Sequence, residues 1–82
     1  MSHSRTRTLA RMAANFVQQY GRPRLRRLIR LLQRNESGQL IARELEVSRE
    51  RVRQWKNAFG KSVYRFEAHA EVRRLAGLKP RP

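Results

Sequence analysis

Cysteine is absent from the 82 residues of this chain, so the sequence excludes disulfides, thiolate metal sites and zinc fingers. The apolar runs are short, and none is long enough to span a bilayer. The N-terminal segment MSHSRTRTLA also lacks the apolar stretch of a signal peptide. These absences favour an intracellular protein, and we expect it in the cytoplasm.

Acidic residues are scarce as well. Six Asp and Glu stand against 20 Lys and Arg, which leaves a formal net charge of +14 at pH 7. A compact domain this basic repels itself unless an anionic partner neutralises it, so nucleic acid is the first partner to consider. A ribosomal-type protein or a membrane-surface peptide would share this charge. With DNA as the partner, the protein would be nucleoid-associated.

Groups that could perform catalysis are also few. His3 lies near the N-terminus and His69 is isolated on an expected helix, with no cysteine and no pair of carboxylates to accompany either. Neither a metal site nor a nucleophile–base pair can be assembled from these residues. We therefore predict that the protein is not an enzyme and uses no metal or cofactor.

Apolar residues recur at helical spacing along most of the chain, which predicts one all-α domain over residues 1–82. We expect a compact bundle of about five short helices around one core, and no strand. The expected helices run from Thr6 or Thr8 to Tyr20, from Arg22 and Pro23 to Arg34, from Ser37 to Leu45, from Arg49 to about Phe59, and from Ser62 to about residue 76. Ser37 is the expected cap of the third helix, and Gly21 and Gly60 are expected to end the first and the fourth. Residues 1–5 and 78–82 are expected to be disordered tails.

The predicted fold is organised around the stretch Ser37–Phe59, SGQLIARELEVSRERVRQWKNAF. Its first half has apolar residues at the i, i+4 spacing of one helix face, and its second half repeats Val52, Trp55 and Phe59 at i, i+3 and i+7. Ser48 stands between the halves and suits the N-cap of the second helix. Two short helices meeting at a tight turn are predicted, with Trp55 in the core and not free to stack on single-stranded bases.

The segment IARELEVSRERVRQW resembles the helix-turn-helix of bacterial and phage DNA-binding proteins. The resemblance makes Ala42 the small residue where the two helices cross, Val47 the apolar plug of the turn and Ser48 the cap of the second helix. The family usually has glycine at the position of Glu46, because that residue tends to take a positive φ. By this resemblance the second helix is a recognition helix, which lies in the major groove of double-stranded DNA.

The outward residues of the second helix are the candidates for base readout. Arginine suits guanine, so Arg49 and Arg53 are assigned to guanine, while Gln54 suits adenine. Glu50 would either accept from cytosine or hold a neighbouring arginine in place. The full base-readout set is Ser48, Arg49, Glu50, Arg53, Gln54 and Asn57.

Phosphate contacts are expected from the ends of the motif and from the basic second helix. The predicted set is Gln39, Arg43, Arg51, Lys56, Arg26, Arg27 and Arg30. The last three arginines would either extend the contact with the DNA backbone or form the solvated face of an amphipathic helix.

We expect a sequence-specific double-stranded DNA-binding protein, such as a small transcriptional regulator. It would act as a homodimer joined through the helix over residues 62–76 or the helix over residues 6–20, unless both helices only wrap the bundle. Two alternatives remain within nucleic-acid binding: a low-specificity architectural or nucleoid-type protein, and a DNA-end-binding module of a recombination or transposition system. A protein-interaction module is a third class, which the basic character of residues 49–56 disfavours.

Overall fold

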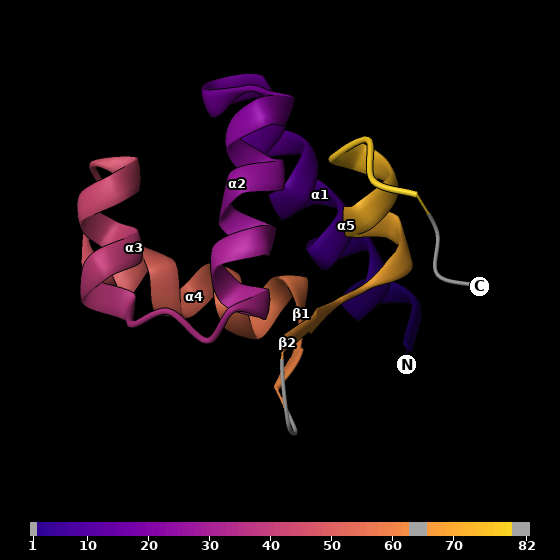
Figure 1. Ribbon diagram of the computed structural model, residues 1–82. Coiled ribbons are helices and arrows are strands. Elements are labelled where there is room, and N and C mark those ends of the chain that lie inside the picture. Colours follow the sequence, from indigo (N-terminus) through magenta and orange to yellow (C-terminus); the bar gives the residue numbers. More distant parts are fainter. Residues whose placement is uncertain (1, 63–65, 80–82) are drawn as a thin grey trace.

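The computed structural model describes residues 2–62 and 66–79. In these residues five helices and a two-stranded sheet follow one another along the chain (Figure 1). The elements are α1 (Ser2–Tyr20), α2 (Arg22–Gln33), α3 (Gly38–Leu45), α4 (Arg49–Phe59), β1 (Gly60–Ser62), β2 (Phe66–Ala68) and α5 (Ala70–Leu75). The predicted mostly helical architecture is confirmed, and the predicted absence of strands is wrong.

The first four helices surround one hydrophobic core. α1 and α3 each pack against both α2 and α4, so the four helices close a ring. The largest fully buried side chains point into this core from α2, α3 and α4, and from the segment that follows α4. They are Leu25, Leu28, Ile29, Ile41, Val52, Phe59, Phe66 and Val72. No polar or charged residue of the described chain is buried, so apolar burial dominates the stability of this fold.

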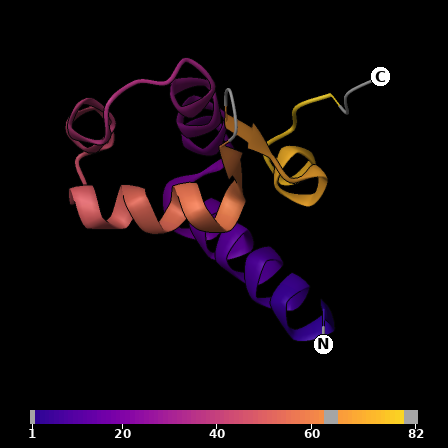
Figure 2. The same cartoon turned by 90° about the horizontal axis from the view of Figure 1, so that it is seen from below.

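Helix α1 contributes to the core through its C-terminal half. Phe16 is buried and lies edge-on to Trp55 of α4, with ring centroids 4.7 Å apart. The ring of Tyr20 also packs against Trp55, with ring centroids 5.7 Å apart. Trp55 is only 5% exposed, so its predicted place in the core is confirmed. Seen from below, α4 crosses in front of α1, whose N-terminal half extends beyond the rest of the molecule (Figure 2).

The start of α1 differs from the prediction. The helix begins at Ser2 and not at Thr6 or Thr8, so residues 2–5 are helical and do not form a separate tail. Residues 2–8 contain no proline or glycine, and adding turns to an existing helix costs far less than nucleating a new one. Gly21 ends α1 as predicted, with a φ of 93° that favours glycine.

A β-hairpin replaces the first half of the predicted fifth helix. Strands β1 and β2 are antiparallel, with Gly60 opposite Ala68 and Ser62 opposite Phe66. Burial alternates along β2, since Phe66 and Ala68 are buried and Glu67 is exposed. This is the two-residue period of a strand, so the helix predicted from Ser62 is wrong, and Ser62 is the last residue of β1. Val63 and Tyr64, which were assigned to that helix, lie outside the described residues.

The hairpin and the short α5 also replace the single helix over residues 62–76 that was one candidate for the dimer contact. Ala68 and Val72 are 5% and 1% exposed within the single chain, so both pack into the chain's own core. Within the expected C-terminal tail, the amide of Leu78 donates to the carbonyl of Arg73 at 2.9 Å. Residues 80–82 lie outside the described residues.

Candidate nucleic-acid interface

Two serine caps and one left-handed residue define the α3–α4 pair. The Oγ of Ser37 accepts from the amide of Leu40, and the Oγ of Ser48 accepts from the amide of Arg51, each at 3.1 Å. Both predicted caps are confirmed. Between the helices, Glu46 takes φ 58° and ψ 46°, the left-handed conformation that was expected at this position. The connection between α3 and α4 is therefore only three residues long, 46–48, and α4 begins directly after it.

Helix α4 is buried on one side and polar on the other. Val52, Trp55 and Phe59 are 2%, 5% and 0% exposed, and they fix the helix on the core. The predicted base-readout residues all lie on the exposed part of α4 or at its N-cap: Ser48, Arg49, Glu50, Arg53, Gln54 and Asn57. The structure therefore brings this set together on one helix surface. Ser48 is additionally engaged as the cap.

Glu50 and Arg53 form a two-pronged ion pair on this surface. Nε of Arg53 lies 3.0 Å from one carboxylate oxygen of Glu50, and Nη2 lies 2.5 Å from the other. The hydrogen bond from Arg53 holds the pKa of Glu50 below its ordinary value and keeps the carboxylate ionised. A guanidinium has five N–H donors, so the Nη1 and Nη2 edge of Arg53 still offers a pair of donors. The predicted role of Glu50 in holding a neighbouring arginine is the one that this geometry favours.

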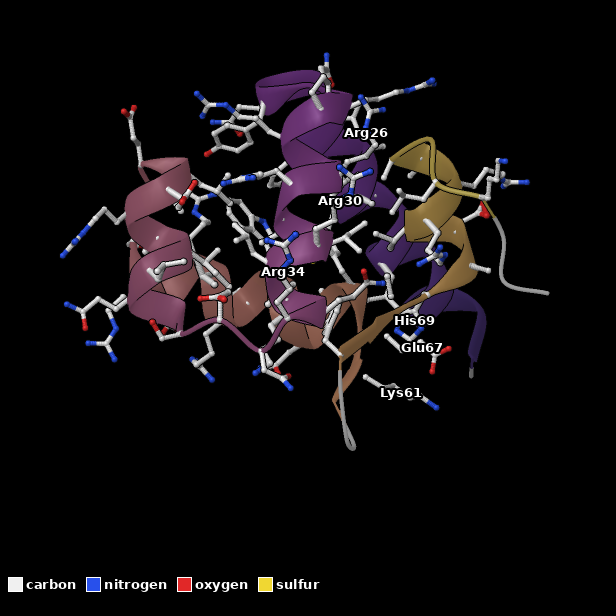
Figure 3. All side chains as sticks on the ribbon, viewed as in Figure 1. Arg26, Arg30, Arg34, Lys61, Glu67 and His69 are labelled. Atoms are coloured by element: carbon white, nitrogen blue, oxygen red, sulfur yellow. The ribbon has the colours of Figure 1, made fainter. Side chains whose placement is uncertain are left out.

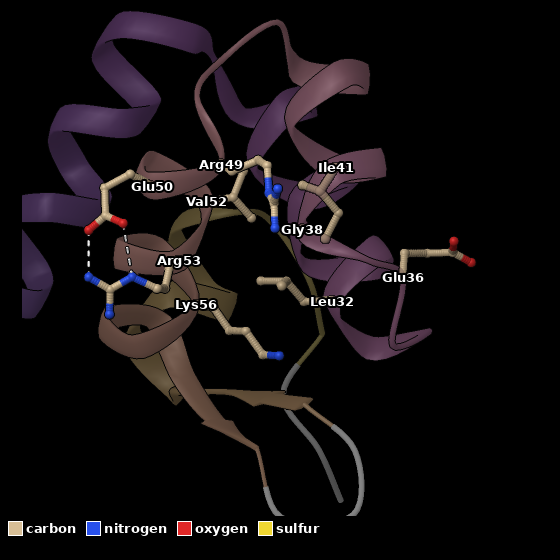
Figure 4. A pocket seen from close by; sticks show the side chains of 9 residues that line it. All are labelled: Leu32, Glu36, Gly38, Ile41, Arg49, Glu50, Val52, Arg53 and Lys56. Atoms are coloured by element: carbon tan, nitrogen blue, oxygen red, sulfur yellow. Dashed lines mark hydrogen bonds and ion pairs between the residues drawn. The ribbon is translucent and has the colours of Figure 1, made fainter.

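A cleft runs along one side of α4, toward the loop between α2 and α3 (Figure 4). Its volume is about 460 Å³. It is lined by Leu32, Glu36, Gly38, Ile41, Arg49, Glu50, Val52, Arg53 and Lys56, which together define the α4 cleft. Arg49, Arg53 and Lys56 follow one another at i, i+4 and i+7, so three cations line the same edge of α4.

The predicted phosphate-contacting residues of the α3–α4 pair are all exposed. Gln39 and Arg43 are exposed on α3, and Lys56 lies on the α4 cleft. Arg51 lies on the other side of α4, in a shallow groove against α1. The basic side chains Arg51 and Lys56 therefore flank the predicted base-readout residues on two sides.

The predicted phosphate contacts on α2 are not gathered with this set. Nη1 of Arg26 donates to the carbonyl oxygen of Ala76 at 3.1 Å, and Arg27 is paired with Glu44 of α3 at 3.0 Å. Arg30 is exposed on the same helix, where Figure 3 labels it with Arg26. The lining of the α4 cleft includes none of the three arginines. Two of these arginines thus hold neighbouring elements together, a use that could not be read from charge alone.

The sequence reading missed two polar residues beside α4. Asn15 and Gln19 of α1 are exposed and line the groove that contains Arg51 and the edge of Trp55. Their signal was available, because they follow one another at i, i+4 on the polar side of α1. Which face of α1 lies next to α4 could be known only from the structure.

The described residues hold no group of three or more His, Cys, Asp or Glu that could bind a metal ion. Among the helices described, none combines the length and the apolar character that crossing a bilayer requires. Comparison with protein-family models, with curated proteins and with solved structures gave no match for this chain.

Proposed function

We propose that the protein is a sequence-specific double-stranded DNA-binding protein, in which α3, the turn at residues 46–48 and α4 form a helix-turn-helix. Helix α4 enters the major groove, which is wide enough to admit a helix, and reads base edges with its exposed side. The protein then acts as a small transcriptional regulator.

One observation carries the proposal: an exposed polar surface on a helix whose other side is anchored in the core. Arg53 is held by Glu50 with a free donor edge, which lowers the entropy that its side chain loses on binding. A paired donor edge matches the O6 and N7 acceptors of guanine. We assign Arg49 and Arg53 to guanine and Gln54 to adenine, with Ser48 and Asn57 at the margins of the same surface.

Backbone contacts complete the proposed complex. Gln39 and Arg43 would meet phosphates on one side of the groove, together with Lys56, while Arg51 would meet the opposite strand. Asn15 and Gln19 lie beside Arg51 and extend this second contact onto α1.

The charge distribution favours one alternative, a low-specificity architectural protein. Residues 36–59 contain five basic and four acidic residues, so most of the net charge of +14 lies outside the proposed motif. Charge-driven binding without base readout would use that remaining surface. The two functions differ in one measurable quantity, the ratio of affinities for a preferred and a random duplex.

Selection of bound sequences from a random duplex pool at physiological salt tests the proposal. We expect a recurring motif that is bound at least about 10³-fold more tightly than random duplex. A two-fold symmetric motif, with half-sites about 34 Å apart, would indicate a homodimer. Recovery of unenriched sequence would reject base readout and leave the architectural function.

A further inference from the structure

The most basic segment of the chain lies outside the proposed motif. Residues 22–34, which span α2 and its C-cap, contain six arginines and no acidic residue. Four of them, Arg26, Arg27, Arg30 and Arg34, occupy the side of α2 opposite its buried leucines, and we name this surface the α2 basic face. A surface of one sign is costly in a free protein and points to an anionic partner.

Two arginines of the α2 basic face have guanidinium groups free for such a partner. Arg26 and Arg27 are engaged with Ala76 and Glu44. Arg30 and Arg34 are exposed, and their side chains make no hydrogen bond or ion pair with the rest of the described chain. They are one helical turn apart, about 6 Å along the axis.

The α2 basic face and the exposed side of α4 lie on different sides of the core. α1 and α3 each contact both α2 and α4. α2 and α4 each bury their inner face on the shared core. In the view of Figure 3, Arg26, Arg30 and Arg34 follow the near side of α2, while α4 lies behind that helix. The molecule measures 33 × 28 × 24 Å, so a straight duplex seated on α4 contacts one side of it and leaves the α2 basic face open.

The chemistry of the α2 basic face favours nucleic acid over a protein partner. Protein interfaces centre on apolar or aromatic anchors. The one large hydrophobic residue that is exposed in the described chain, Leu40, belongs to α3 and not to α2. Arginines without an apolar anchor suit a row of phosphates, which the guanidinium fork binds through paired donors.

We propose that the α2 basic face binds the phosphate backbone of a second DNA duplex, so that one protein molecule bridges two duplexes. The first duplex is the one held by α4, and to that extent the inference rests on the proposed function. The second contact is independent of sequence, because it reaches phosphates and no base edges.

A capture assay tests bridging. A duplex carrying the selected motif is fixed to beads, and a labelled duplex of unrelated sequence is added with increasing amounts of protein. We expect capture of the labelled duplex to rise and then fall, because excess protein occupies each duplex separately. The variant Arg30→Ala/Arg34→Ala should capture at least about tenfold less labelled duplex while binding the motif duplex as the wild type does. The variant Arg11→Ala/Lys79→Ala removes the same charge from exposed sites outside α2 and should capture normally.

Three results would overturn bridging by the α2 basic face. The first is that the wild type captures no second duplex. The second is that the Arg30→Ala/Arg34→Ala variant captures as much as the wild type, which would assign bridging to a dimer. A parallel loss of motif binding in that variant would place both arginines on the first duplex. Failure of the proposed function would give a different result, because beads with and without the motif would then retain the protein equally. In that case the Arg30→Ala/Arg34→Ala variant would still show whether bridging depends on these two arginines.

Discussion

At the scale of single residues, the pairing of Arg53 with Glu50 has the largest consequence for function. Both side chains are more than half exposed, at 65% and 58%, so the pair contributes little to stability. Its effect is on orientation, because two hydrogen bonds fix the plane of the guanidinium and leave one donor edge outward. A solvated arginine would have to order that edge on binding.

The pH dependence of this pair follows from the lowered pKa of Glu50. Arg53 stabilises the ionised carboxylate, so the pKa of Glu50 lies below its ordinary 4.5. A carboxyl group with a lowered pKa keeps its favourable interaction above the unfolded value and loses it as pH falls through the folded value. The pair therefore persists on acidification from neutral pH to 4.5 and is lost only below it. Carbon-detected NMR titration should give a midpoint for Glu50 that rises in Arg53→Ala; equal midpoints would show that the pair does not form in solution.

At the scale of elements, helical periodicity predicted α1 to α4 and both serine caps. It worked because each of these helices has one buried stripe, as in the spacing of Val52, Trp55 and Phe59, and because Ser37 and Ser48 have few roles besides capping at those positions. The same periodicity misled after Phe59. Ala68 and Val72 fit the i, i+4 spacing of a helix in the sequence, but two strands of three residues each are too short to show a clear alternation.

Gly60 was predicted to end α4, and it has a further role that the sequence did not reveal. Its backbone is extended, with φ −174°, and a Cβ atom here would lie 2.2 Å from the carbonyl oxygen of Glu67. The close approach of β2 therefore requires glycine at this position. No local pattern reports which distant backbone will lie against a residue, so this requirement came only from the tertiary structure.

The substitution Gly60→Ala tests that requirement. The added methyl group cannot be accommodated without moving β2, so we expect a loss in the free energy of unfolding of about 1–3 kcal/mol or more. Gly38→Ala is the control, because no atom lies within 4 Å of a Cβ at Gly38 and alanine there should be neutral or stabilising by up to about 1 kcal/mol. Urea denaturation measures both variants. Equal stability of the two would mean that the hairpin does not pack against Gly60 as described.

At the scale of the whole molecule, Trp55 joins the proposed recognition surface to the core. Its ring packs against Phe16 and Tyr20 of α1, so the helix that carries the predicted readout residues is fixed to the first helix of the chain. Trp55→Ala should lower the free energy of unfolding by roughly 3–5 kcal/mol, as truncation of a buried aromatic does. The exposed neighbour Gln54 provides the control, since Gln54→Ala should change stability by less than about 0.5 kcal/mol. Thermal and urea unfolding that left Trp55→Ala as stable as Gln54→Ala would contradict the packing of α1 on α4.

Most of the net positive charge and the predicted base-readout residues lie on different parts of the molecule. The α3–α4 segment is nearly neutral, whereas α2 is strongly basic, so most of the net charge lies outside the proposed readout surface. Salt should therefore weaken binding to random duplex and to the motif alike, while the preference between them depends on α4. This separation makes the contribution of one α4 residue measurable against a background of charge.

The most direct test of base readout by α4 is the affinity of Arg53→Ala for the selected motif and for random duplex at one salt concentration. We expect a loss of about 1–3 kcal/mol on the motif, relaxed preference at one base position, and little change on random duplex. Arg74→Ala is the matched control, because Arg74 forms the same i, i+3 ion pair with Glu71 on α5 and should bind as the wild type does. An equal loss by Arg53→Ala on both duplexes would make Arg53 a phosphate contact and contradict base readout by this residue.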